Sequence, residues 1–152
     1  MAGAWTNKGA YRVLSVYDRA ATAPANFYVA LCTNATPPTV DTNTMADLAE
    51  ITAGNGYTAG GISVARNSTD FDTLTEDDTN NRGYDQIKDL VWTASGGPIP
   101  ASGSGARWAV LTDANATPSA REVLRYWDLE SDRSVADGQP LTLQDLETRI
   151  NN

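Results

Sequence analysis

Short apolar runs, separated by loops rich in glycine, proline, asparagine and aspartate, occupy most of this 152-residue chain. Several runs alternate apolar with small or polar side chains, as Ile62 and Val64 do with Ser63. Alternation with a period of two is typical of strands that bury one face. No strand–helix–strand rhythm repeats, which argues against a parallel α/β sheet. The pattern predicts a mainly β chain, an antiparallel β-sandwich or barrel-like domain, with strands at 27–33, 61–66, 71–74, 84–93, 107–112, 121–130 and within 141–150.

Two helices are expected outside the sheet. Apolar residues recur at helical spacing between Asn7 and Arg19, and Thr6 or Asn7 is suited to cap this helix. A short second helix follows Thr44, because Thr44 and Asp47 approximate a capping box. In the run 84–93 the apolar residues switch from one set of alternate positions to the other near Asp89, which predicts a β-bulge there.

The chain has the length of one domain with one core. Residues 1–8 carry no periodic pattern, so we expect an extended N-terminal arm at 1–8 and a single β-rich domain at 9–152. The start of the chain has no charged segment followed by an apolar stretch, and no run approaches the length of a membrane helix. We therefore expect that the protein does not associate with membranes. We also expect that it is assembled in a reducing cytoplasm.

Charge and composition disfavour several classes of function. Eleven basic against 19 acidic residues leave a net charge of −8, which repels phosphate backbones and anionic membranes. Histidine is absent, which excludes Ser-His and Cys-His nucleophile pairs. The single Cys32 lies in an apolar run and is expected to be a small buried hydrophobe.

Acidic residues offer the remaining candidates for chemistry. A cluster at 70–78 has two interpretations, a calcium-binding loop or a solvated loop, and its spacing does not match the calcium motif D-x-D-x-D-G with a Glu at position twelve. Carboxylate pairs for glycoside hydrolysis, Asp85 with Asp89 or Asp128 with Glu130, have no cleft in the sequence to place them. We predict no catalytic, cofactor-binding or metal-binding residue, and no enzyme activity.

Trp5 is the main candidate for binding another protein. It stands in a polar, glycine-bearing segment without local apolar partners, so it either anchors a neighbouring protein or folds back on its own sheet. We expect the interface to comprise Trp5, Asn7, Lys8, Tyr11 and Arg12. The tryptophans within strands are expected to lie in the core, although exposed rings would suit sugar binding.

Five stretches in succession resemble small virion proteins of tailed bacteriophages, described as capsid decoration (cement) or tail-fibre-like proteins. They are FYVALCT at 27–33, GNGYTAGGI at 54–62, LVWTA at 90–94, ARWAVLTD at 106–113 and DGQPLTL at 137–143. The likeness extends over most of the chain from about Asn7 onward, and its specificity lies in the order of the stretches.

The resemblance implies a β-rich domain that docks on the capsid exterior and stabilises the shell. The implied partner is the major capsid protein, with the chain itself a homo-oligomer, trimer or dimer, at capsid symmetry positions. An acidic surface agrees with the outside of a capsid, because the inside faces packaged DNA. An alternative is a phage tail or fibre-associated component that contacts carbohydrate or a host surface.

Overall fold

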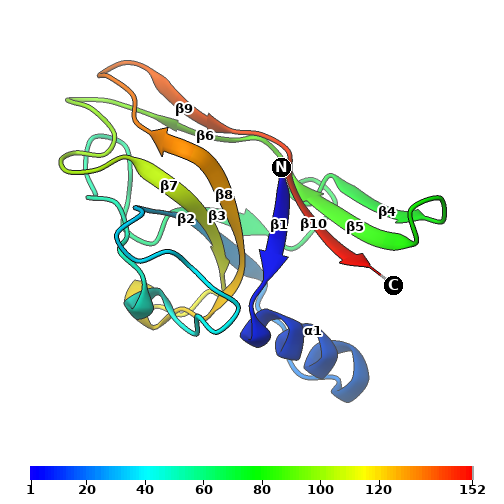
Figure 1. The fold of residues 1–152 in the computed structure, drawn as a ribbon. Coiled ribbons are helices and arrows are strands. Elements are labelled where there is room, and N and C mark those ends of the chain that lie inside the picture. Colours follow the sequence, from blue (N-terminus) through cyan, green and yellow to red (C-terminus); the bar gives the residue numbers. More distant parts are fainter. Residues whose placement is uncertain (152) are drawn as a thin grey trace.

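A computed structural model describes residues 1–151. An eight-stranded sheet curls into a half-barrel in the order β3-β2-β7-β8-β1-β10-β5-β4, and β6 pairs with β9 in a second, small sheet (Figure 1). The mainly β, barrel-like class is therefore confirmed. The strands are β1 (Ala2–Trp5), β2 (Asn26–Cys32), β3 (Ile62–Ala65), β4 (Thr73–Asp77), β5 (Arg82–Ile87), β6 (Leu90–Thr93), β7 (Ala106–Thr112), β8 (Val123–Arg133), β9 (Pro140–Leu143) and β10 (Leu146–Asn151).

The core lies on both faces of the central strands. In β2, Val29 and Leu31 pack into the main core with Trp127, whereas Ala30 and Cys32 face a smaller cluster around Met45. Both faces of β2 are thus covered, which explains why its sequence is apolar at consecutive positions. The expectation of a buried Cys32 is confirmed, and burial raises the pKa of its thiol to about 12.

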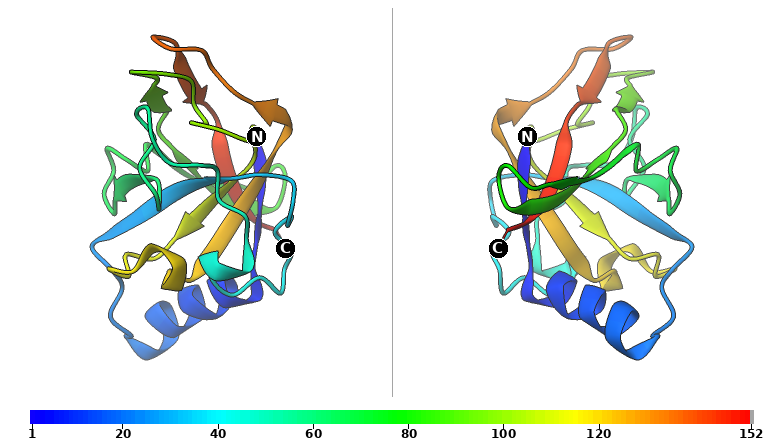
Figure 2. Two further views of the ribbon diagram at one scale, coloured as in Figure 1. Left: turned by 90° about the vertical axis from the view of Figure 1, so that its left-hand side faces the viewer. Right: turned by 90° about the vertical axis from the view of Figure 1, so that its right-hand side faces the viewer.

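The predicted extended arm at 1–8 is wrong, because residues 2–5 form a strand inside the sheet. Strand β1 pairs in parallel with β10 and antiparallel with β8 (Figures 1 and 2). Its Gly3 lies against the indole of Trp127, where an added Cβ would stand 2.3 Å from Nε1. A strand of four residues is too short to show an alternating pattern in the sequence, and β1 is a strand because it pairs with β8 and β10.

Helix α1 spans Asn7–Arg19, as the periodicity predicts. Thr6 is its N-cap, and the Thr6 hydroxyl accepts a hydrogen bond from the Gly9 N–H at 2.9 Å. Gly9 is the one residue of α1 that is buried, however, and the large apolar side chains of the helix are not. Figure 2 shows α1 crossing beneath the open end of the half-barrel.

Two single turns of 3-10 helix complete the helical elements of residues 1–151, η1 (Met45–Asp47) and η2 (Pro118–Ala120). The capping box at η1 is present: the Asp47 carboxylate accepts hydrogen bonds from the backbone N–H groups of Thr44 and Asn43. These bonds lower the pKa of Asp47. The second predicted helix is therefore only one turn long.

The predicted strand at 84–93 is two strands in different sheets. Strand β5 ends at Ile87 beside β10 and β4, and β6 begins at Leu90 beside β9. Between them the Lys88 ammonium bonds the Asp70 carboxylate. The switch in the apolar positions near Asp89 thus marks the passage of the chain from one sheet to the other, and not a bulge. Strand β4 also runs to Asp77, so the solvated loop is shorter than expected.

Candidate protein-docking surface

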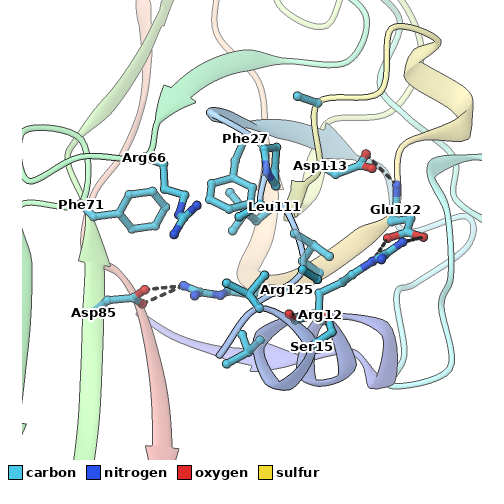
Figure 3. Close-up of a pocket in the computed structure, with 18 of the residues that line it drawn as sticks. Arg12, Ser15, Phe27, Arg66, Phe71, Asp85, Leu111, Asp113, Glu122 and Arg125 are labelled. Atoms are coloured by element: carbon cyan, nitrogen blue, oxygen red, sulfur yellow. Dashed lines mark hydrogen bonds and ion pairs between the residues drawn. The ribbon is translucent and has the colours of Figure 1, made fainter. Parts of the chain in front are cut away.

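A groove opens between helix α1 and the outer strands of the half-barrel. Its cavity volume is about 830 Å³, and α1, the segment 21–24, β4 and β5 all contribute to it. Figure 3 shows an apolar centre flanked by two ion pairs. The apolar lining includes Val13, Tyr17, Phe27, Phe71, Leu74 and Leu111. We call this cavity the α1 groove.

One side of the α1 groove is held by an ion pair between neighbouring strands. Arg125 of β8 donates through Nη1 to both carboxylate oxygens of Asp85 on β5, at 2.8 and 2.7 Å. The same guanidinium stacks on the Trp5 ring with its carbon 4.1 Å from the ring centroid. Its Nε is buried and has no hydrogen-bond partner. Arg125 therefore joins β1, β5 and β8 at the edge of the groove.

The opposite side of the groove is held by α1 itself. Arg12 donates to both oxygens of Glu122, at 2.6 and 2.7 Å, and the Lys8 ammonium lies 3.8 Å from the same carboxylate. The hydrogen bond from Arg12 lowers the pKa of Glu122 and raises that of Arg12. These contacts orient the first turns of α1 on the end of β8.

The later turns of α1 leave large apolar side chains in solvent. Tyr11 is 61% exposed, Leu14 59% and Tyr17 88%. Across the groove, Leu74 on β4 is 83% exposed. Clusters of exposed apolar side chains on a small protein mark interaction sites. We define the α1 outer face as Asn7, Tyr11, Leu14 and Asp18, which share the side of the helix opposite Gly9.

The five residues predicted as an interface fall in two places. Trp5 is a partly buried residue of β1, and its indole N–H donates to the Arg149 carbonyl at 2.9 Å, so it folds back on its own sheet. Lys8 and Arg12 are paired with Glu122, as described above. The Asn7 amide donates to Asp41 at 2.9 Å. Tyr11 is the one large apolar side chain of the five that faces solvent.

Three exposed apolar residues were not predicted: Tyr17 and Leu74, which line the α1 groove, and Ile150 on β10. Tyr17 belongs to the helical stripe that periodicity identifies, but such a stripe normally covers a core. Leu74 and Ile150 belong to short strands whose exposure depends on which strands lie beside them. Their sequence signal is weak, because an isolated apolar residue in a polar strand is common.

The acidic candidates are occupied by basic and backbone partners. Asp70 accepts from Lys88 and from the Ala65 N–H, which lowers its pKa. Asp77 accepts from Asn80 and from Arg82, so the acidic cluster does not converge on one point. Within residues 1–151 no three acidic or cysteine side chains gather in a geometry that could hold a metal ion.

The carboxylates proposed for hydrolysis are also engaged. Asp85 is paired with Arg125, as above, and Asp128 accepts two hydrogen bonds from Arg107, at 2.6 and 3.0 Å. The bonds from Arg107 lower the pKa of Asp128. This direction is the opposite of what a general acid in glycoside hydrolysis needs, because such an acid has a raised carboxyl pKa.

The aromatic rings considered for sugar binding are mostly in the core. Trp92 and Trp127 are buried, which confirms them as core residues. Trp108 is partly exposed, packs edge-on to Tyr126 and donates its indole N–H to Asn34.

Comparison with protein families, with curated proteins and with solved structures finds no match to this chain. Within residues 1–151, none of the helices has the length and apolarity that crossing a membrane requires.

Proposed function

We propose that this protein is a structural virion protein, which binds the outer surface of a phage capsid and stabilises neighbouring major capsid subunits. The observation that carries the proposal is the α1 outer face, which presents Tyr11 and Leu14 to solvent on a helix fixed at its first turns. Burying such side chains against a partner supplies much of the free energy of protein association.

A rigid helix is a good docking element because little conformational entropy is lost when it binds. Helix α1 is anchored by the Thr6 cap and by the Arg12–Glu122 pair. Next to it, the Asn7 N–H donates to the Val40 carbonyl at 2.7 Å, which brings the exposed Val40 side chain beside the start of the helix. The two segments together offer an apolar contact larger than the helix alone.

The net charge of −8 also supports a place on the capsid exterior, because a protein facing packaged DNA would favour basic groups. The resemblance to phage decoration proteins supplies the partner, the major capsid protein, and virion assembly in the host cytoplasm. The alternative, a tail or fibre-associated component that contacts carbohydrate, stays a prediction that a glycan-binding screen would test.

The test adds purified protein to expanded capsids assembled without it, followed by sedimentation through a density gradient. Removing residues 1–8 is unsuitable, because it would delete β1 from the sheet. Instead, Tyr11→Ser with Leu14→Ser should raise the dissociation constant from the capsid by at least about tenfold.

The matched control is Val91→Ser, which removes an exposed apolar side chain from the small sheet. It should bind capsids like the wild type. Equal capsid occupancy by the Tyr11/Leu14 variant and the wild type, or no binding of the wild type at all, would overturn the proposal.

A further inference from the structure

The outer end of the large sheet has two very different faces. Strands β4, β5 and β10 lie side by side there, and residues directly opposite one another share a face. Leu74 lies opposite Asp85, which lies opposite Thr148. Two residues along each strand, Glu76 lies opposite Gly83, which lies opposite Ile150, on this same face. Because Asp85 reaches Arg125 in the α1 groove, this face is the one that looks toward the groove.

The other face of these strands is already satisfied within the chain. Arg82 bonds Asp77 at 2.9 Å and lies 3.7 Å from Glu147, which also pairs with Arg149. Tyr84 lies beneath the Arg82 guanidinium. This network of alternating charges needs no external partner.

The face toward the groove, in contrast, keeps two large apolar side chains and one carboxylate without partners in residues 1–151, beside the Asp85–Arg125 pair. Leu74 is 83% exposed and Ile150 56% exposed, although both lie on a concave surface where a core would normally form. Glu76 is exposed and makes no ion pair within residues 1–151. This face therefore combines exposed apolar surface with a free negative charge.

The end of helix α1 has the complementary character. Tyr17 is 88% exposed and lines the groove opposite Leu74. Arg19 follows it in the last turn and makes no ion pair in the described part of the chain. Figure 2, right, shows the β4–β5 hairpin and α1 on the same side of the molecule, the hairpin above the helix.

One end of this surface carries Tyr17 and an arginine without an ion pair, and the other carries Leu74 and a glutamate without one, so the surface is complementary to itself under a two-fold rotation. Turning a second copy by 180° about an axis through this side places its α1 against the hairpin of the first, and the reverse contact follows by symmetry. Opposite charges then meet twice, and the exposed apolar side chains on both elements become covered.

We propose that two copies of this chain form a two-fold symmetric dimer, in which the end of α1, with Tyr17 and Arg19, packs on the groove-facing side of the partner's β4–β5 hairpin, with Leu74 and Glu76. Ile150 lies at the margin of the same contact. The dimer goes beyond the proposed capsid binding and does not depend on it. The α1 outer face, with Tyr11 and Leu14, stays free for another partner.

The experiment is sedimentation equilibrium of the purified full chain up to about 100 μM, a concentration at which an interface of micromolar affinity is occupied. The wild type should be a dimer. Arg19→Glu and Glu76→Lys, each alone, should weaken the dimer by at least about tenfold, because each places like charges at both contacts. Tyr17→Ser with Leu74→Ser should weaken it similarly.

Mixing the two charge variants is the decisive step. In a heterodimer of the Arg19→Glu and Glu76→Lys chains, one contact has the charges exchanged and the other is native, so both contacts are attractive again. The mixture should therefore dimerise with an affinity close to that of the wild type, although each variant alone dimerises at least about tenfold more weakly. Recovery also proves that both variants are folded. A three-fold ring cannot alternate two variants, so a trimer would not be restored in this way.

Matched controls are Arg133→Glu and Asp132→Lys, which alter exposed charges at the far end of β8 and should leave the dimer unchanged. A monomeric or trimeric wild type, dimerisation unaffected by both charge variants, or a mixture that fails to associate would each overturn the proposal. The Tyr11/Leu14 variant distinguishes the two proposals, because it should lose capsid binding and still dimerise.

Discussion

The contact between α1 and β8 depends on the absence of a side chain at Gly9. A Cβ added there would lie 1.9 Å from the Leu124 carbonyl oxygen and 2.7 Å from its carbon. Both are backbone atoms near the start of β8, so no rotamer change can relieve the overlap. The helix and the strand would have to separate by more than 1 Å before that contact reached 3.0 Å.

Separation on this scale breaks the hydrogen bonds that fix the helix start. The Thr6 N–H donates to the Leu124 carbonyl at 3.1 Å, and the Thr6 hydroxyl donates to the Val123 carbonyl at 2.6 Å. Leaving two such buried pairs unmade costs roughly 3–4 kcal/mol. Alanine favours a helix interior over glycine by about 1 kcal/mol, which offsets part of this loss. We therefore expect Gly9→Ala to lower the free energy of unfolding by about 2–3 kcal/mol.

Urea denaturation followed by tryptophan fluorescence measures this change, with all variants at one protein concentration because self-association alters apparent stability. The matched control is Gly83→Ala, since a Cβ at Gly83 meets nothing within 4 Å. The control should be unchanged or up to about 1 kcal/mol more stable. If Gly9→Ala were as stable as the wild type, helix propensity would outweigh the overlap, and the close approach of α1 to β8 would be refuted.

Three further predictions test other parts of the structure. Because the buried Cys32 thiol has its pKa raised to about 12, it should not react with a thiol reagent at pH 8 until the chain is unfolded; rapid reaction of the native protein would contradict its burial. Asp70, Glu122 and Asp128 have folded-state pKa values below the ordinary 3.8 for Asp and 4.5 for Glu, so the stability that they contribute is present above those values and is lost as the pH falls below them. Urea midpoints between pH 7 and pH 3 should therefore fall on the acid side, with a smaller fall in Glu122→Gln, and a midpoint that rises toward pH 3 would be the opposite result. Arg121→Lys should lower the free energy of unfolding by roughly 1–3 kcal/mol, because a lysine cannot donate both to Asn115 and to Gly60 while stacking on Tyr28; thermal denaturation equal to that of the wild type would show that these contacts contribute nothing.

Local pattern was sufficient for much of the β architecture and for the first helix. The alternation in Ile62–Ala65 and the doubly apolar run of β2 identify strands, because each side chain's environment is determined by a period of two. Helix α1 has the bounds that its spacing and its Thr6 cap indicate. Burial of Cys32 and of Trp127 follows from their apolar neighbours in the same strand.

The candidate surface was predicted only in part. Tyr11 is exposed as expected of an interface residue, whereas Trp5 is held within the sheet by Arg149 and Arg125. The exposure of Leu74 could not be foreseen, because it depends on how far the hairpin extends beyond its neighbours.

The chain's own pattern thus determines most of the strands and the first helix, since these elements depend on residues close together in the sequence, and its composition determines the net negative charge. Tertiary structure alone decided that β1 lies between β8 and β10, that the run after Arg82 divides between two sheets, and that the apolar stripe of α1 faces solvent. Each of those outcomes depends on partners more than 30 residues away, as Trp5 beside Arg125 illustrates. A periodic pattern shows that a face is apolar, and only the assembled chain shows whether anything covers it.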